Sequence, residues 1–262
     1  MAAAFNKIVL DFNSNLFEAL SKATIFEALS KGRIGNHLVR EMTNGVPVVR
    51  TTSKYSIPAQ FFAPIHEAVA DNILETINRQ SLQGPNPAGF NNALIEVYDA
   101  SYAKMGYHSD QALDLVDDSL IAVFSCYENP DELTEKHIRK LRIKDKVTDE
   151  EFEYSLTHNS VILFSTETNK RFQHKIILDP VPVNSPDNKW LGITFRTSKT
   201  YILFKDDLPM FANGNVLTMA DKDQETAFYK LRGEENRSLN FVYPELEYTI
   251  SPADIMQPQR RI

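Results

Sequence analysis

Two residue types that bind transition metals stand one position apart in the segment His108-Ser109-Asp110. On an extended strand, residues i and i+2 project from the same face about 7 Å apart at their Cα atoms, so the two side chains can share one ion. A histidine from another strand would complete the two-histidine, one-carboxylate face that leaves positions open on non-haem iron. Chance alone produces about 0.4 such pairs in a chain of this composition, so the pair needs further support.

The order of two later residues, His174 and Arg196, supplies that support. His174 lies in a strand-like run 64 positions after Asp110, and Arg196 comes a further 22 positions on. An exposed strand position and a surface ion pair would explain each residue separately, but not their order. The sequence therefore predicts an iron site formed by His108, Asp110 and His174, with Arg196 nearby.

Hydrophobic periodicity and turn signals predict a mainly β protein with flanking helices. Two nearly identical segments with capping-box spacing predict short helices at 16–22 and 25–31, and a longer helix is expected from 58 to about 78. A Gly- and Pro-rich loop at 81–89 precedes many short strands, which is typical of a barrel or sandwich, and 223–237 is expected to be helical. The expected strands are 93–98, 105–108, 120–126, 138–143, 161–164, 172–178 and 191–197.

We expect three segments along the chain. Residues 1–57 form an N-terminal helical preface with a lid-like part, and residues 58–204 form the β core with its supporting helix. Residues 205–262 form a C-terminal extension with mixed helix and strand patterns. A length of 262 residues still allows one sandwich or barrel core.

The composition is that of a globular protein, with 42% hydrophobic and 24% charged residues. The net charge of -7 gives no general attraction to the phosphates of nucleic acids. No apolar run approaches the length of a bilayer-crossing helix, and the single cysteine, Cys126, cannot form an internal disulfide. The cytoplasm is therefore the expected compartment, and no membrane partner is expected.

A basic segment at 136–146 is the best argument for contact with nucleic acid. Acidic residues precede and follow it, so a solvated and locally neutralised hairpin is favoured over a phosphate-binding strip. Both interpretations stay open at this point. The six basic residues are Lys136, Arg139, Lys140, Arg142, Lys144 and Lys146.

Over about residues 40–200 the sequence resembles the AlkB-like branch of the Fe(II)- and 2-oxoglutarate-dependent dioxygenases. The resemblance implies a double-stranded β-helix, or jelly roll, with helices on its outer sheet. It also implies Fe(II) as the metal, 2-oxoglutarate as co-substrate and O2 as oxidant. Four stretches carry it, namely FNNALIEVY at 90–98, MGYHSD at 105–110, SVILFSTETNKRFQH at 160–174 and ITFRTS at 193–198.

The resemblance assigns roles to particular residues. It makes His108, Asp110 and His174 the iron ligands and matches Tyr98 to a tyrosine that contacts 2-oxoglutarate. Arg196 matches the last arginine of the closing motif Arg-x-Asn-x-Thr-x-Arg, and its planar donor fork suits a carboxylate. Two further co-substrate contacts are expected from the same strand, Thr194 and Ser198.

The sequence departs from the family pattern at positions that bear on the site. Trp190 stands where the closing motif begins with arginine, so Arg196 with Ser198, Lys189 or Arg171 has to hold the distal carboxylate. Glu96 replaces an asparagine beside Tyr98, and its carboxylate would repel an anion unless it is protonated or turned away. Ala112 replaces the acidic residue that nucleobase-repair members often carry.

The leading interpretation is an AlkB-like dioxygenase that hydroxylates a C–H bond and releases succinate and CO2. On an N-methyl group, the hydroxylated product would lose formaldehyde. Its substrate, a small molecule or a modified base, is not expected to lie in ordinary duplex DNA. The first alternative is a nucleic acid base demethylase that uses the basic segment, and the second is a degenerate oxygenase that binds a ligand without turnover.

Overall fold

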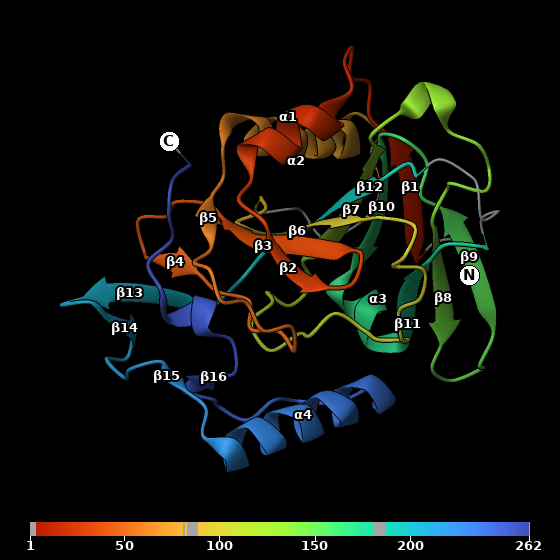
Figure 1. Cartoon of the computed structure of the whole chain (residues 1–262). Coiled ribbons are helices and arrows are strands. Elements are labelled where there is room, and N and C mark those ends of the chain that lie inside the picture. The colour runs from red at the N-terminus through yellow and green to blue at the C-terminus, as the bar shows by residue number, and fades with distance from the viewer. Residues whose placement is uncertain (1–3, 81, 83–88, 181–186, 262) are drawn as a thin grey trace.

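An eight-stranded, mainly antiparallel sheet forms the centre of the structure, a computed structural model that describes residues 4–80, 82, 89–180 and 187–261 (Figure 1). Strand β5 (Gln60–Phe61) joins it by parallel pairing with β3. The predicted loop at 81–89 lies mostly outside the described residues. In spatial order the other strands are β1 (Phe5–Val9), β10 (Ser160–Ser165), β7 (Leu120–Tyr127), β12 (Trp190–Arg196), β6 (Asn92–Tyr98), β3 (Arg33–Val39) and β2 (Glu27–Ser30).

Two helices cover the outer face of this sheet, and Figure 1 shows them together at the top of the molecule. Helix α1 (Leu16–Ala23) begins where the Asn15 side chain accepts a hydrogen bond from the Phe17 amide. Helix α2 (Pro64–Arg79) has proline at its first position and buries residues at helical spacing. Each fully buried aliphatic side chain contributes about 1.5–3 kcal/mol. On α2 the buried aliphatic side chains are Val69, Ala70, Ile73 and Ile77.

A smaller sheet packs against the inner face of the large one. It contains β11 (Phe172–Ile177), β8 (Lys140–Asp145) and β9 (Glu151–Ser155), in the spatial order β11-β8-β9. Helix α3 (Thr166–Arg171) connects β10 to β11. Alternation along β8 directs Leu141 and Ile143 into a core shared with Tyr98 and Trp190 of the large sheet. Two facing sheets with helices outside confirm the predicted mainly β, jelly-roll fold class.

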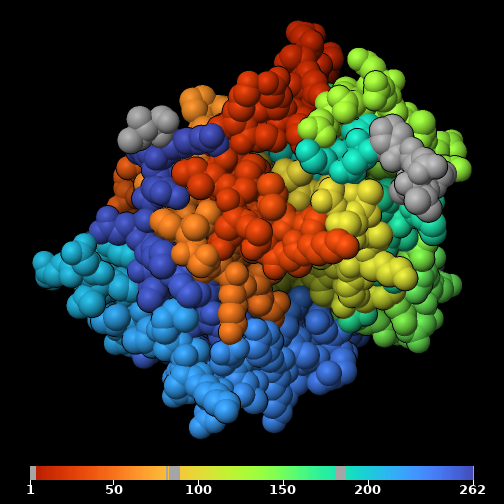
Figure 2. All heavy atoms as spheres, viewed as in Figure 1, coloured from red at the N-terminus to blue at the C-terminus, as the bar shows by residue number. Residues whose placement is uncertain are grey.

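The C-terminal residues form smaller elements and one long helix, α4 (Lys222–Arg237), which confirms the helix predicted at 223–237. Figure 2 shows part of this region, in lighter blue, along the lower part of the molecule, while the darker blue residues that follow rise along its left side. Among the described residues, no helix is both long and apolar enough to cross a membrane. The remaining elements are β4 (Val46–Pro47), η1 (Pro130–Glu132), β13 (Tyr201–Lys205), β14 (Leu208–Phe211), β15 (Thr218–Met219), β16 (Tyr248–Thr249) and η2 (Pro252–Ile255).

The prediction of a second short helix at 25–31 is wrong, because these residues contain strand β2, which pairs with β3. The capping-box residues bind other partners. The Thr24 hydroxyl donates to the Leu20 carbonyl at the end of α1, and the Glu27 carboxylate accepts hydrogen bonds from the Ser56 and Ile57 amides. Together with β1 and β3, this strand shows that the first 57 residues contribute three strands to the large sheet. The division of the chain at 57 and 204 stays a prediction.

The predicted strand at 105–108 is also wrong, since only His108 pairs there, as an isolated bridge. The other six expected strands are present, with ends that differ by at most two residues. The missed strands β1 and β3 carry polar residues, such as Asn6 and Asn36, that interrupt the apolar pattern. The register of β3 places Arg33 opposite Tyr98, and Tyr98 lies opposite Trp190.

Trp190 fills the inner face of the sheet because the residue two positions along is glycine. A Cβ atom on Gly192 would lie 2.0 Å from the Trp190 ring. The indole is buried and lies 4.8 Å, centroid to centroid, from the ring of Tyr98. The position of the Trp190 ring therefore requires the absence of a side chain at residue 192.

We predict that Gly192→Ala destabilises the protein by about 1–3 kcal/mol, because the new methyl group forces the indole to move. The measurement is urea unfolding of this variant beside Gly106→Ala, whose added Cβ would meet nothing within 4 Å. Adding Trp190→Leu should recover part of the loss. Equal unfolding midpoints for the two single variants would contradict this packing account.

Candidate metal centre

Reciprocal backbone hydrogen bonds bring two histidines together. His108 lies between β6 and β7, and His174 lies within β11. The His108 amide donates to the His174 carbonyl at 3.0 Å, and the His174 amide donates to the His108 carbonyl at 2.7 Å. This antiparallel bridge places the two imidazole centroids 4.7 Å apart. The segment before β7 is thus fixed to the smaller sheet at one residue pair.

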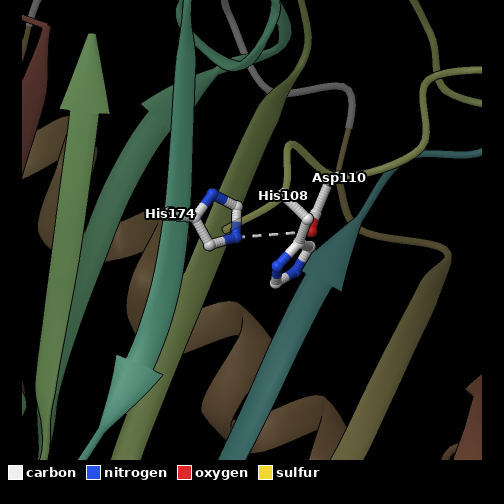
Figure 3. Close-up of side chains that lie close together, drawn as sticks. All are labelled: His108, Asp110 and His174. Atoms are coloured by element: carbon white, nitrogen blue, oxygen red, sulfur yellow. Dashed lines mark ion pairs between the residues drawn. The ribbon is translucent and has the colours of Figure 1, made fainter. Parts of the chain in front are cut away.

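Asp110 completes a cluster of three potential metal ligands. Each of the three side chains offers one nitrogen or oxygen atom, and these atoms all lie within 4.8 Å of one another. Oδ1 of Asp110 is 3.6 Å from Nε2 of His174, and Figure 3 shows the three side chains gathered at one point. Nδ1 of His108 lies 3.0 Å from the Gly106 carbonyl, which suits an N–H there and leaves Nε2 for a metal.

The surroundings favour the protonation states that a metal requires. Burial, together with the nearby His174, lowers the pKa of His108 to about 3, so its imidazole is neutral at pH 7. Burial alone would raise the pKa of Asp110, but Arg196 and His174 outweigh it and hold that pKa well below its ordinary range. Neutral imidazole and ionised carboxylate are the forms that bind metal, so neither group has to release a proton.

Arg196 orients the aspartate. Its Nε donates to Oδ2 of Asp110 at 2.8 Å, and both side chains are buried. A charge-assisted bond to one carboxylate oxygen leaves the other, Oδ1, facing His174. Among the described residues, Nη1 of Arg196 is buried without a hydrogen-bond partner, so it is a free donor at the site.

The backbone between the ligands is held from two helices. Asn169 of α3 bonds to both the amide and the carbonyl of Asp110, each at 2.7 Å. From α4, Asn236 accepts from the Ser109 amide at 3.0 Å, and Glu235 accepts from the Ala112 amide at 2.8 Å. These bonds fix the directions of the ligand side chains, because they fix the segment that carries them.

A cavity of about 110 Å³ opens beside the cluster. Part of its polar lining comes from three neighbouring strands, with Arg33 on β3, Glu96 and Tyr98 on β6, and Thr194 and Arg196 on β12. Arg232 of α4 also reaches it. Its apolar side chains are Leu94, Met105, Val123, Leu141 and Ile176. The candidate ligands therefore adjoin a cavity whose wall carries arginine and apolar side chains.

A comparison with protein families decides which proteins this chain is related to. The family model for the 2OG-Fe(II) oxygenase superfamily matches residues 31–196, more than half of the chain. The chain belongs to this superfamily. It is therefore a dioxygenase of the type that uses Fe(II), 2-oxoglutarate and O2, and the cluster of two histidines and one aspartate suits such a metal.

Other comparisons add less. A search of curated proteins finds no match. Similar solved structures include OsALKBH1, at 13% identity and a TM-score of 0.47, covering 74% of this chain and 98% of that one. A prolyl-4-hydroxylase from Pseudomonas putida has 12% identity, a TM-score of 0.41 and coverages of 74% and 92%. A bsmA homolog from Methylobium petroleophilum PM1 has 14% identity, a TM-score of 0.41 and coverages of 69% and 79%.

The residues expected to contact 2-oxoglutarate fall into two groups. Tyr98, Thr194 and Arg196 line the cavity of this oxygenase. Ser198 does not, because its hydroxyl donates to the Val48 carbonyl at 2.6 Å. The suggestion that Ser198 assists Arg196 is therefore not supported by its position.

The two other cations suggested in place of the missing arginine also lie outside the cavity lining. Lys189 has its ammonium group 3.5 Å from the Glu128 carboxylate, and both side chains are exposed. Arg171 forms an ion pair with Asp145 at 2.7 Å. Neither residue replaces the arginine that the family motif has at position 190.

The basic segment at 136–146 is not a strip of free cations. Arg139 is buried and donates to the carbonyls of Asp99 and Tyr102, which contradicts its proposed contact with phosphate. Lys140 and Arg142 both pair with Glu153. Lys144 pairs with Asp149, and Lys146 donates to α4 carbonyls, while Lys136 is exposed. These ion pairs confirm that acidic side chains neutralise Lys140, Arg142 and Lys144 in the hairpin.

Sequence reasoning missed the site residues outside the motif-bearing stretches. Arg33 comes just after the helix expected at 25–31, so its place in a strand is not predicted. Asn236 and Glu235 lie more than 120 residues after the loop that they hold. The sequence offers only a polar pair near the end of a mostly polar helix, which does not indicate what the pair contacts.

We predict that Asn236→Ala lowers the affinity for Mn(II) about 10-fold, because the Ser109 amide loses its partner and the ligand segment loosens. Alanine favours a helix, so loss of α4 would not explain the result. Equilibrium binding of Mn(II), followed by electron paramagnetic resonance, measures the change. Asn240→Ala, which changes an exposed side chain after the same helix, is the control. Wild-type affinity in Asn236→Ala would show that α4 does not position the ligands.

Proposed function

We propose that this dioxygenase holds Fe(II) with His108, Asp110 and His174 and hydroxylates a C–H bond of its substrate. The observation that carries the proposal is the convergence of these three donors beside a cavity with cationic side chains. Three ligands on one face leave the remaining positions of an iron ion for co-substrate and oxygen. The free Nη1 of Arg196 would meet a co-substrate oxygen near the metal.

When bound, iron, 2-oxoglutarate and O2 supply the oxidising chemistry: 2-oxoglutarate is converted to succinate and CO2, one oxygen atom enters succinate, and the other enters the substrate C–H bond. The chain's own residues prepare the site. Arg196 keeps Asp110 ionised and fixes its orientation. Met105, Leu141 and Ile176 make part of the wall apolar, which limits water beside the reacting groups.

For the branch and substrate, we propose an AlkB-like enzyme whose substrate is a small molecule or a modified base outside ordinary duplex DNA. The motif stretches quoted above support the branch. The net charge of -7 and the neutralised hairpin support a substrate other than a long polyanion. If the reacting carbon is an N-methyl group, hydroxylation leads to formaldehyde and the demethylated nitrogen.

The two alternatives gain no support from the described residues. A base demethylase that grips phosphate through 136–146 would need the cations that pair with Glu153 and Asp149. The degenerate oxygenase rests on Trp190 and on Glu96, whose carboxylate would repel the co-substrate. Its two oxygens instead accept from Arg33 and from the Tyr98 hydroxyl, each at 2.6 Å. The Glu96 carboxylate is therefore paired within the site, so its charge does not count against an active enzyme.

We predict that the purified protein binds Fe(II) and 2-oxoglutarate without oxygen and releases succinate when oxygen is admitted. His174→Ala should lower succinate formation at least about 100-fold, because a buried ligand is lost. His137→Ala, which changes a histidine outside the cluster, should match the wild type. Mass spectrometry of succinate measures both. No binding and no succinate with any substrate panel would reject the proposed function.

A further inference from the structure

A row of three residues crosses the inner face of the large sheet. Arg33 on β3 lies opposite Tyr98 on β6, which lies opposite Trp190 on β12. Neighbouring strands are about 4.8 Å apart, so the Cα atom of Arg33 lies roughly 10 Å from that of Trp190. An arginine side chain spans most of this distance. The guanidinium of Arg33 can therefore reach the part of the cavity where an arginine at position 190 would place its own.

Trp190 itself offers no charge there. Its ring lies over Gly192 and against Tyr98, and it is buried. The Tyr98 hydroxyl, which has one proton to donate, gives it to Oε2 of Glu96 at 2.6 Å. Trp190 and Tyr98 therefore offer no positive charge to a ligand carboxylate.

Glu96 holds Arg33 in the cavity. Nε of Arg33 donates to Oε1 of Glu96 at 2.6 Å, and Nη2 lies 3.4 Å from the Ser53 hydroxyl. Burial alone would lower the pKa of Arg33, but the Glu96 carboxylate outweighs it and raises that pKa, so the charge is retained. Arg33 also belongs to the lining of the cavity beside the three candidate ligands. A second guanidinium donor is therefore available in the cavity.

The cavity has cations at two ends. Arg196 bonds to Asp110 at the metal end, and Arg232 bonds to the Ser109 carbonyl and to Glu235. Arg33 is six positions away along the sheet from the row of Arg196, since Val39 and Asn92 pair in that row. Both side chains nevertheless line the same cavity. This arrangement suits a short dicarboxylate with one end at the metal and the other at Arg33.

We propose, on the basis of the function proposed above, that Arg33 binds the distal carboxylate of 2-oxoglutarate and replaces the arginine absent at position 190. Glu96 acts as a positioning residue, because its contacts with Arg33 and Tyr98 direct the guanidinium. The charge that the family motif places on β12 is thus supplied from β3, two strands away in the same sheet.

The test is calorimetric titration of the Mn(II)-loaded protein, without oxygen, with two ligands. One is 2-oxoglutarate, and the other is 2-oxobutanoate, which lacks the distal carboxylate. Arg33→Met should weaken 2-oxoglutarate binding about 10- to 100-fold, the value of a charge-assisted bond, and leave 2-oxobutanoate binding unchanged. Arg40→Met, whose arginine pairs with Glu67 on α2, is the matched control and should bind both ligands as the wild type does.

A double variant separates carboxylate binding from simple neutralisation of Glu96. If Arg33 binds the ligand, the double variant Arg33→Met with Glu96→Gln should still bind 2-oxoglutarate weakly. Its affinity for 2-oxobutanoate should equal that of the wild type. Recovery of wild-type affinity in the double variant, or no loss in Arg33→Met, overturns the inference and leaves the proposed function standing. Failure of the wild type to bind Mn(II) or 2-oxoglutarate overturns both. Binding of Mn(II) to each variant, in the same titrations, confirms that its site is folded.

Discussion

The two backbone hydrogen bonds between His108 and His174 are the constraint on which the site depends. They connect a segment without regular structure to the strand β11 of the smaller sheet. Without this bridge, the two imidazoles would belong to separate parts of the chain. With it, Asp110 follows two positions later and meets His174 from the same side. The hydrogen bonds from Asn169, Arg196 and α4 then hold the segment 108–110 in the position that the bridge gives it.

Charge inside the cavity follows a second constraint, which is that a buried charge needs a partner. Each carboxylate there faces a guanidinium, Asp110 with Arg196 and Glu96 with Arg33. A divalent metal ion and a doubly charged dicarboxylate carry opposite charges of equal size. Binding both therefore leaves the net charge of the cavity unchanged. The loss of an arginine at 190 is therefore compatible with an active oxygenase.

The cluster of His108, Asp110 and His174 could be predicted from sequence because these residues match a family motif in type and order. The strand expected to carry His108 is absent, since that segment has no regular structure apart from one bridge. The core strands could be predicted because both of their faces, or alternate residues, are apolar. Strand β2 could not, since Thr24 and Glu27 have the pattern of a helix cap, and only the pairing with β3 and the contact of Glu27 with Ser56 show otherwise. Arg33 could not, because its role depends on the register between β3 and β6.

The most direct test of the metal centre is the anomalous diffraction of manganese in crystals grown with Mn(II) and 2-oxoglutarate. We expect one strong anomalous peak within bonding distance, about 2.0–2.3 Å, of His108, Asp110 and His174. A peak bound elsewhere, with these three side chains left without metal at saturating Mn(II), would contradict the account.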